Sequence, residues 1–186
     1  GLASYLKANG FPNVSVIDSA SPGMSYDEFQ ATITALRPVV VGFTTTTMDW
    51  PEVVSLARIV KDVNPDTVVV VGGFHLSCYP RESLSFPCVD LGVVGDGEPT
   101  MLEIVQRVAA GNLLYGIDGT WYRDAQGLPT QARPRKPVED LDSLPWAARE
   151  LFPNHLYRAI TIQRPFATMT TVRGCPYACR YCGQTG

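Results

Sequence analysis

Thr67-Val-Val-Val-Val-Gly-Gly73 is the stretch that decides the fold. Its four consecutive valines are apolar on both faces, as expected of a buried strand in a parallel sheet. A similar run, Pro38-Val-Val-Val-Gly-Phe-Thr44, precedes it, and Asp90-Leu-Gly-Val-Val-Gly95 follows it. Helical patterns separate the three runs, and such alternation is typical of a parallel α/β sheet.

The segments around these runs complete the expected fold. Ser25 to Arg37 begins with a capping box and predicts a helix. Helical structure is also predicted for the segment from Pro51, for the turn Pro80 to Leu84, and for Pro99 to Ala110. Asn13-Val-Ser-Val-Ile-Asp18 predicts a further strand. Because parallel crossovers need helices on both faces, we expect a three-layer, Rossmann-like parallel sheet.

The pattern changes after Gly111. Gly116 to Tyr122 and Leu128 to Gln131 flank a polar turn and predict a hairpin. Arg133 to Pro153 is rich in proline and predicts an extended linker, and Ala167 to Val172 predicts a last strand.

Composition narrows the classes of function. The 186 residues are 45% hydrophobic and 18% charged, as in an ordinary globular protein, and carry a net charge of −3. Without Lys/Arg clusters, nucleic acid is not the expected main partner, and no apolar stretch approaches the ~18 residues of a membrane span. Three of the five cysteines lie close together, which suits a cytoplasmic, reducing location. The chain opens inside an expected helix (Gly1 to Asn9), so we expect a fragment cut at both ends.

The expected strand ends are small and polar. They are Thr44-Thr45-Thr46-Thr47, Gly72-Gly73-Phe74-His75 and Gly95-Asp96-Gly97-Glu98. Ligands of open parallel sheets bind beyond such ends, where glycine allows close backbone approach. The sequence therefore predicts a large phosphorylated cofactor at this edge, although glycines that merely shorten turns remain an alternative. His75, as a lone histidine, is more readily explained as a hydrogen-bonded structural residue than as a metal ligand, and Cys78 and Cys88 receive no role.

Arg173-Gly-Cys-Pro-Tyr-Ala-Cys-Arg-Tyr-Cys-Gly183 places Cys175, Cys179 and Cys182 in a CxxxCxxC spacing. Three thiolates can hold three irons of a cubane and leave the fourth without a protein ligand. A zinc site would need a fourth Cys or His nearby, and a disulfide would suit a secreted chain; chance spacing is the third alternative.

This motif resembles the cluster signature of radical S-adenosylmethionine (radical SAM) enzymes. The resemblance implies that Cys175, Cys179 and Cys182 bind a [4Fe–4S] cluster that chelates S-adenosylmethionine, and that the backbone near Tyr181 contacts the adenine. It implies reductive cleavage of that molecule to a 5′-deoxyadenosyl radical, with electrons from a donor such as flavodoxin or ferredoxin and a small-molecule substrate.

The three strand ends, taken in order, are similar to the cobalamin-binding domain that precedes the cluster motif in cobalamin-dependent radical SAM proteins. The resemblance implies that Thr44 to Thr47 and Gly72 to His75 line the cobalamin site, with Gly95 to Glu98 near its nucleotide tail. The DxHxxG loop of other cobalamin domains is absent, since Asp18-Ser-Ala-Ser-Pro-Gly23 has no histidine. The first strand of the domain is also expected to be missing.

These features predict residues 1–112 as the cobalamin-binding domain, 113–165 as hairpin and linker, and 166–186 as the start of a truncated radical SAM partial TIM barrel. The expected parent is a methyltransferase, or an oxidoreductase or cyclase, acting on an unactivated carbon, and the fragment alone is expected to be inactive. The alternative is a radical SAM Fe–S oxidoreductase whose Rossmann-like domain binds no cobalamin and serves as a docking module.

Overall fold

The computed structural model describes residues 1–18, 23–155, 157, 168–175, 177, 179 and 180, and it contains a five-stranded mixed sheet. The strands follow the order β1-β2-β3-β4-β5, and their bounds are Val40–Thr44, Val68–Gly72, Leu91–Val93, Thr120–Arg123 and Pro129–Gln131. β1, β2 and β3 run parallel, whereas β4 pairs antiparallel with both β3 and β5. The predicted α/β class is confirmed, as is the parallel pairing of the long strands; the predicted hairpin forms β4 and β5, which extend the same sheet in antiparallel pairing.

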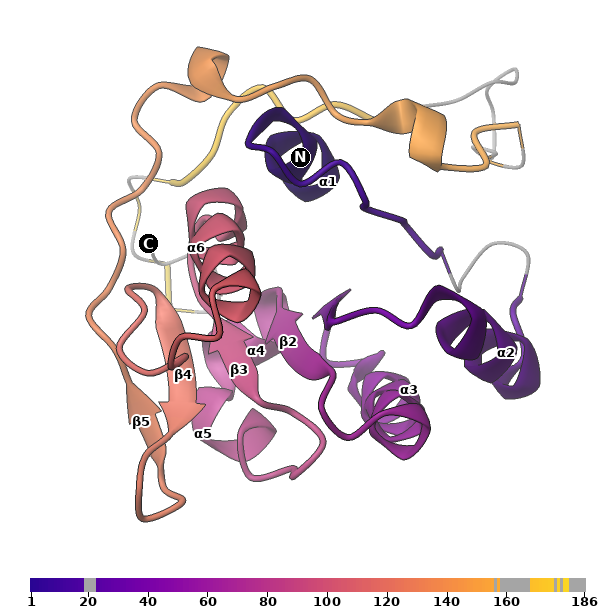
Figure 1. Ribbon diagram of the computed structural model, residues 1–186. Helices are drawn as coiled ribbons and strands as arrows, with labels where there is room; N and C mark the ends of the chain where they lie inside the picture. Colours follow the sequence, from indigo (N-terminus) through magenta and orange to yellow (C-terminus); the bar gives the residue numbers. More distant parts are fainter. Residues whose placement is uncertain (19–22, 156, 158–167, 176, 178, 181–186) are drawn as a thin grey trace. The chain divides into compact units, whose positions relative to one another are not determined.

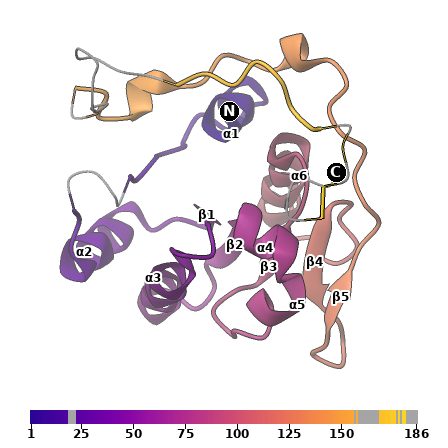
Figure 2. The same ribbon diagram turned by 180° about the vertical axis from the view of Figure 1, so that it is seen from behind.

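Helices cover both faces of this sheet, as Figures 1 and 2 show from opposite sides. The helices of the unit that holds the sheet are α2 (Tyr26–Leu36), α3 (Trp50–Val63), α4 (Phe74–Cys78), α5 (Pro80–Ser83) and α6 (Gly97–Ala109). α1 (Leu2–Ala8) and short 3₁₀ turns at Leu141–Ser143 and Arg149–Leu151 belong to a second unit. On one face, Phe43 of β1 meets Phe29 of α2, with ring centroids 6.4 Å apart. On the other face, a Cβ placed on Gly42 of β1 would lie 3.5 Å from the terminal methyl carbon of Met101 of α6.

After α6 the chain runs back beside that helix before it forms β4, and this path explains why β4 is antiparallel to β3. The Arg107 guanidinium, in the last turn of α6, donates to the carbonyls of Leu113 (3.1 Å) and Tyr115 (3.0 Å). The chain then reaches the end of β3, where the amide of Val94 donates to the carbonyl of Gly119 at 2.9 Å. Because β4 starts beside the end of β3, it can only run in the opposite direction.

Two predicted strands are not formed. The described residues 13–18 and 168–172 have no strand structure. A strand is defined by the ladder it makes with a neighbour, and within the described chain β1 pairs only with β2. An alternating apolar pattern alone was therefore not sufficient to form a strand at these positions. The barrel strand expected at 167–172 is not shown, and Ala167 itself lies outside the described residues.

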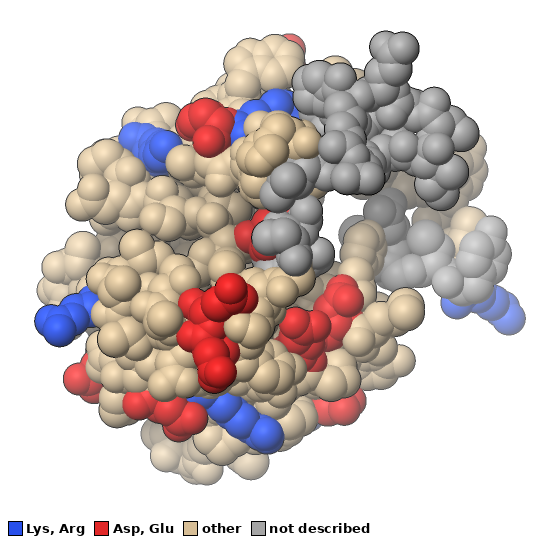
Figure 3. Space-filling view, turned by 90° about the vertical axis from the view of Figure 1, so that its right-hand side faces the viewer, with Lys and Arg blue, Asp and Glu red and all other residues tan. Residues whose placement is uncertain are grey.

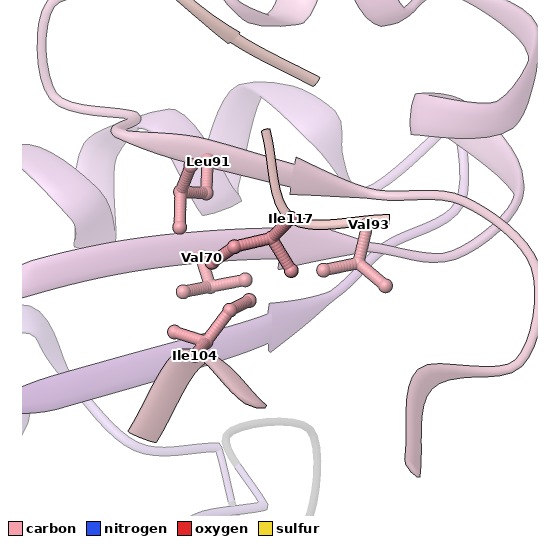
Figure 4. Close-up of a cluster of buried hydrophobic side chains, with 5 residues drawn as sticks. All are labelled: Val70, Leu91, Val93, Ile104 and Ile117. Carbon is pink, nitrogen blue, oxygen red and sulfur yellow. The ribbon is translucent and has the colours of Figure 1, made fainter. Parts of the chain in front are cut away.

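One hydrophobic cluster joins β2, β3 and α6. Figure 4 shows Val70, Leu91, Val93, Ile104 and Ile117 pointing toward one another between these elements. Ile104 and Ile117 are completely buried. Packing in this layer fixes the start of α6 beside the end of β3, which is where a strand-end ligand would lie.

A polar network ties the opposite, amino-terminal ends of the strands. The Asp90 carboxylate accepts from the amide of Val69 at 2.7 Å and from the ammonium of Lys61 at 2.6 Å. The guanidinium of Arg123 donates to the carbonyls of Leu84 (2.9 Å) and Val89 (2.6 Å). The buried carbonyls and amides of the connection into β3 are thereby satisfied, which the low dielectric of the interior requires.

Acidic side chains are prominent on the face that carries α2 and α3, as the space-filling view shows (Figure 3). The first turn of α2 contributes Asp27 and Glu28, and this helix has no basic residue in its last turn. Negative charge near a helix N-terminus is favourable because it complements the helix dipole.

The chain forms two compact units: Tyr26–Glu139, and Gly1–Ser25 together with Asp140–Gly186. The first unit holds the whole sheet, so the sheet continues past residue 112 into the hairpin; the domain boundaries given above remain predictions. Among the described helices, none combines the length and apolar character needed to cross a bilayer.

Candidate functional site: the carboxyl edge of the parallel strands

The three parallel strands end at one edge of the sheet. Thr44 stands opposite Gly72 in the β1–β2 ladder, and the amide of Thr45 donates to the carbonyl of Gly72 at 3.0 Å. A methyl group placed on Gly72 would lie 3.6 Å from the carbonyl oxygen of Val93, at the end of β3. The structure therefore brings the three loops that the sequence singled out to one edge, and the topology places it where open α/β sheets bind ligands.

The four threonines after β1 differ in what their hydroxyls do. Thr45 is buried and its hydroxyl donates to the carbonyl of Thr46 at 2.7 Å. The hydroxyl of Thr46 donates to the Asp49 carboxylate at 2.6 Å. Thr44 and Thr47 are exposed. Two of the four hydroxyl protons are thus used inside the loop, which leaves Thr44 and Thr47 as the candidate donors to a ligand.

Gly73 makes the turn from β2 into α4. Its φ of 97° and ψ of −174° belong to a region that essentially only glycine adopts. A Cβ at this position would lie 2.6 Å from the carbonyl oxygen and 2.8 Å from the amide nitrogen of Thr45. Gly73 is therefore required by close backbone approach, and not only as a residue that shortens a turn.

Phe74 and His75 lie in a helix and not at a strand end. The sequence predicted them as the end of the second long strand, but β2 stops at Gly72 and α4 begins at Phe74. Gly73 ends the extended backbone and is the N-cap of α4, and the amide of His75 donates to the carbonyl of Thr45 at 3.3 Å. The short helix leaves Phe74 half exposed and turns His75 into the protein.

His75 is packed among aromatic rings. It is 3% exposed, its ring stacks on Trp50 at 4.4 Å and 24°, and Tyr79 lies 5.3 Å away. Its Nδ1 lies 3.3 Å from the hydroxyl oxygen of Thr47, while its Nε2 is buried without a hydrogen-bond partner. This placement supports the interpretation of His75 as a structural, hydrogen-bonded residue.

The burial of His75 predicts that stability depends on pH. Desolvation lowers the pKa of His75 below 6.5, and the negative charge of Glu82 opposes this only in part. The unfolded chain then binds the proton more readily than the folded chain, so the free energy of unfolding falls as the pH drops through about 6.5. Urea unfolding of wild type and His75→Asn at about pH 7.5 and about pH 5.5 measures this, because asparagine does not titrate. An equal pH dependence in both proteins would contradict the prediction.

The loop after β3 offers an open backbone. Gly95 has a φ of 84°, and a Cβ there would meet nothing within 4 Å. The Asp96 carboxylate accepts from the amide of Val138 at 2.7 Å, and Glu98 is buried. Both acidic groups are thus engaged with the protein, and the N-cap position of α6 has no side-chain hydrogen bond to the helix. The open backbone at Gly95 leaves room for a polar ligand group at the start of α6.

Two large apolar side chains are exposed beside these loops. Met48 is 91% exposed and Phe74 is 53% exposed. A corrinoid presents a broad apolar ring edged by amide groups, so its site requires both apolar surface and hydrogen-bond donors. Exposed apolar side chains, hydroxyls of Thr44 and Thr47, and open glycine backbone meet these needs, and the residues fit a cobalamin.

The cysteine motif lies in the other unit and only part of it is described. Cys175 and Cys179 are exposed and free, whereas Tyr181 and Cys182 lie outside the described residues. No three His, Cys, Asp or Glu side chains are grouped to hold a metal among the residues that the structure does describe. Since the third cysteine is outside that set, the three-cysteine site stays a prediction.

Sequence reasoning missed two residues of this edge, Trp50 and Met48. Trp50 is buried at the start of α3 and stacks on His75. Its helical spacing with Val53, Ala57 and Val60, all of them buried, is a signal that could have placed it on the inner face of the helix. Met48 carries no such signal, because its exposure depends on the path of a loop. Of the two cysteines without a role, Cys88 is buried and Cys78 is exposed.

The match to a family model defines the class of protein. The model described as "B12 binding domain" matches residues 2–105. That match covers more than half of the chain, and the chain therefore belongs to the B12-binding domain family. It is the form of that domain found in the N-terminal portion of cobalamin-dependent radical SAM enzymes.

Curated relatives include cyclases and methyltransferases. The chain is 33% identical to the anaerobic magnesium-protoporphyrin IX monomethyl ester cyclase of Rubrivivax gelatinosus, over 98% of this chain and 34% of the relative. It is 31% identical to an uncharacterised methyltransferase of Pyrococcus horikoshii, over 93% of this chain and 37% of the relative. The chain thus spans about a third of the length of the relatives it matches.

Solved structures share the fold. The radical SAM methyltransferase TsrM of Kitasatospora setae, solved with cobalamin and a [4Fe-4S] cluster, superposes with a TM-score of 0.73 at 19% identity, over 98% of this chain and 37% of that chain. The cobalamin-dependent radical enzyme OxsB, solved with aqua-cobalamin and S-adenosylmethionine, gives 0.64 at 18% identity, over 73% and 19% of the two chains.

Proposed function

We propose that this chain binds cobalamin at the carboxyl edge of β1, β2 and β3 and is part of a radical SAM enzyme. The observation that carries the proposal is the meeting of three strand-end loops at one edge, two with open or closely packed glycine backbone and one with outward hydroxyls. The family match to residues 2–105 supports it. The similarity to cyclases and methyltransferases supports a parent enzyme that transfers a methyl group to, or oxidises or cyclises, a small-molecule substrate at an unactivated carbon.

Four residues are proposed as the principal contacts of the cofactor. The hydroxyls of Thr44 and Thr47 donate hydrogen bonds to it, and Met48 and Phe74 pack against its apolar surface. Bound cobalamin supplies a cobalt centre that carries alkyl groups, and the protein supplies its position and its surroundings. His75 does not reach the cofactor itself, because it is buried within the aromatic group.

Cobalamin binding is the first test of this proposal. We expect the purified chain, mixed with hydroxocobalamin and desalted, to retain about one corrinoid per chain, measured by visible absorption. Phe74→Glu is expected to weaken binding by about tenfold or more, because it places a charge against an apolar ring. Leu128→Glu is the matched control, since Leu128 is also exposed but follows the β4–β5 turn.

Two results would count against cobalamin binding at this edge. If wild type retains no corrinoid, the domain is better explained as a docking module, the alternative given above. If Phe74→Glu and Leu128→Glu bind equally well, a corrinoid is bound elsewhere.

A second cofactor site is proposed at the cysteine loop. We propose that Cys175, Cys179 and Cys182 ligate a [4Fe–4S] cluster in the whole enzyme, and that the backbone at Tyr181 contacts the adenine of S-adenosylmethionine. Thiolate number and spacing support this assignment. The cluster supplies the electron that cleaves S-adenosylmethionine, and a flavodoxin or ferredoxin is the proposed source of that electron.

The cluster is tested in the full-length parent after anaerobic reconstitution. Cys179→Ala is expected to lose most of the bound iron and the absorption near ~400 nm. Cys78→Ala is the control, because Cys78 is also an exposed free cysteine but lies on α4. Unchanged iron content in Cys179→Ala would refute ligation by this loop.

A further inference from the structure

The contact between His75 and Thr47 determines whether the Thr47 hydroxyl donates into the protein or outward to a ligand. The Nδ1 atom of His75 lies 3.3 Å from the hydroxyl oxygen of Thr47. If Nδ1 carries the proton, Thr47 accepts from it and its own proton is free to point outward. If Nδ1 is unprotonated, the proton of Thr47 is used inside the protein, and Thr47 can only accept from a ligand.

The burial of Nε2 selects between these two tautomers. Nε2 is buried and has no hydrogen-bond partner within the described chain. A buried N–H donor without a partner is rarer in proteins than an acceptor with an unused lone pair. The proton therefore belongs on Nδ1, which donates a hydrogen bond to the hydroxyl oxygen of Thr47. Nε2 is the unprotonated nitrogen. Desolvation lowers the pKa of His75 below 6.5, so at about pH 7.5 the neutral ring, with a single proton to place, is the main form.

The rings around His75 hold this arrangement in place. Trp50 stacks on the imidazole at 4.4 Å, and Tyr79 covers it at 5.3 Å. Trp50 in turn meets Phe86 edge-on at 5.5 Å. The imidazole is thus held by packing on more than one side, and its Nδ1 is presented to the loop after β1.

We propose that His75 is a positioning residue that donates from Nδ1 to Thr47 and thereby makes the Thr47 hydroxyl a donor toward an oxygen acceptor of the bound corrinoid. The inference rests on the proposed cobalamin site. In this role Thr47 differs from Thr46, whose hydroxyl donates to the Asp49 carboxylate, and from Thr45, whose hydroxyl donates to a backbone carbonyl. Both corrin side-chain amides and the nucleotide phosphate offer an oxygen of this kind.

The tautomer is measured directly by ¹⁵N NMR of the histidine rings in the wild-type chain without corrinoid. We expect one imidazole with a protonated Nδ1 and an unprotonated Nε2, assigned to His75 by its absence in His75→Asn. His155, the other histidine, is exposed and serves as the internal reference. A protonated Nε2 on His75 would overturn the proposal, since Thr47 would then donate inward.

Corrinoid affinity tests the role of the hydroxyl. Thr47→Val is expected to weaken hydroxocobalamin binding about three- to tenfold, and Thr47→Ser to restore it, as befits one hydrogen bond. Thr34→Val is the matched control and is expected to bind as wild type, because Thr34 is an exposed threonine of α2 whose hydroxyl donates to the carbonyl of Gln30. Equal losses in Thr34→Val and Thr47→Val, or no loss in Thr47→Val, would overturn the proposal.

A double substitution connects the two residues. His75→Leu leaves the Thr47 hydroxyl in place but no longer orients its proton outward, so it is expected to weaken binding by less than Thr47→Val. In the Thr47→Val background, removing His75 is expected to cause no further loss, because the hydroxyl that it orients is already gone. Additive losses would show that His75 does not act through Thr47. If His75→Leu does not fold, the NMR result and the Thr47 series decide.

Cobinamide, which lacks the nucleotide phosphate, locates the acceptor. A Thr47→Val loss that persists with cobinamide identifies a corrin amide, and a loss seen only with cobalamin identifies the phosphate. Wild type that binds no corrinoid would overturn the proposed function together with its acceptor, whereas normal binding with a protonated Nε2 would overturn only the role of His75.

Discussion

Gly73→Ala is expected to lower the free energy of unfolding by about 4 kcal/mol, because the backbone at this position is one that alanine does not adopt without strain. The added Cβ would also lie 2.6 Å from the carbonyl oxygen of Thr45, a backbone atom that cannot rotate away. Urea unfolding followed by tryptophan fluorescence, to which the buried Trp50 and Trp121 contribute, measures the change.

Gly95→Ala separates strain from overlap. Gly95 also has a positive φ, of 84°, but a Cβ there would meet nothing within 4 Å. Its alanine variant is expected to lose only about 1 to 2 kcal/mol. A difference between the two variants of less than about 1 kcal/mol would show that the close approach of Gly73 to Thr45 is unimportant. Gly73 precedes Phe74 and packs against the backbone of Thr45. Its alanine variant is therefore also expected to lose corrinoid binding if it folds.

Ile104→Ala is expected to cost about 3 kcal/mol of unfolding free energy, the second large effect. Ile104 is completely buried among Val70, Leu91, Val93 and Ile117, so truncation leaves a cavity between α6 and the sheet. Ile104→Val removes a single methylene and is expected to cost about 1 kcal/mol. Thermal unfolding of the three proteins measures the series.

The outcome for Ile104 also bears on the site. The same cluster positions α6, whose first turn follows Gly95. A variant that keeps wild-type stability would mean that α6 is held by its polar contacts alone. Those contacts are substantial, since Glu103 of α6 pairs with Arg107 at 2.7 Å and also with Arg135. Burial by itself would raise the pKa of Glu103, but hydrogen bonds from Arg135 and Arg107 outweigh it and the pKa is lowered.

The sheet and its helices were predictable where the pattern was local and strong. The valine runs became β1 and β2, Pro51 lies in the first turn of α3, and Ser25 immediately precedes α2, as expected. The threonine, glycine and Gly-Asp-Gly-Glu loops were brought to one edge because parallel strands share their carboxyl ends. What each side chain of those loops contacts was beyond the sequence, since it depends on residues distant in the chain.

His75 shows this limit most clearly. Its position after two glycines indicated a strand end that lines the cofactor site, but the turn at Gly73 starts a helix that carries the ring inward against Trp50. Thr45 and Thr46 likewise looked equivalent to Thr47 until their hydroxyls were seen to be used within the loop.

The sequence by itself determined the α/β class and the loops of the carboxyl edge, and it predicted the cysteine site by resemblance, because periodicity, turn residues and spacing are local properties. Only the tertiary structure decided that β4 runs antiparallel, that residues 13–18 form no strand, and that His75 faces Thr47. Each of these depends on which segment lies alongside another, and neither strand pairing nor burial exists until the chain has folded.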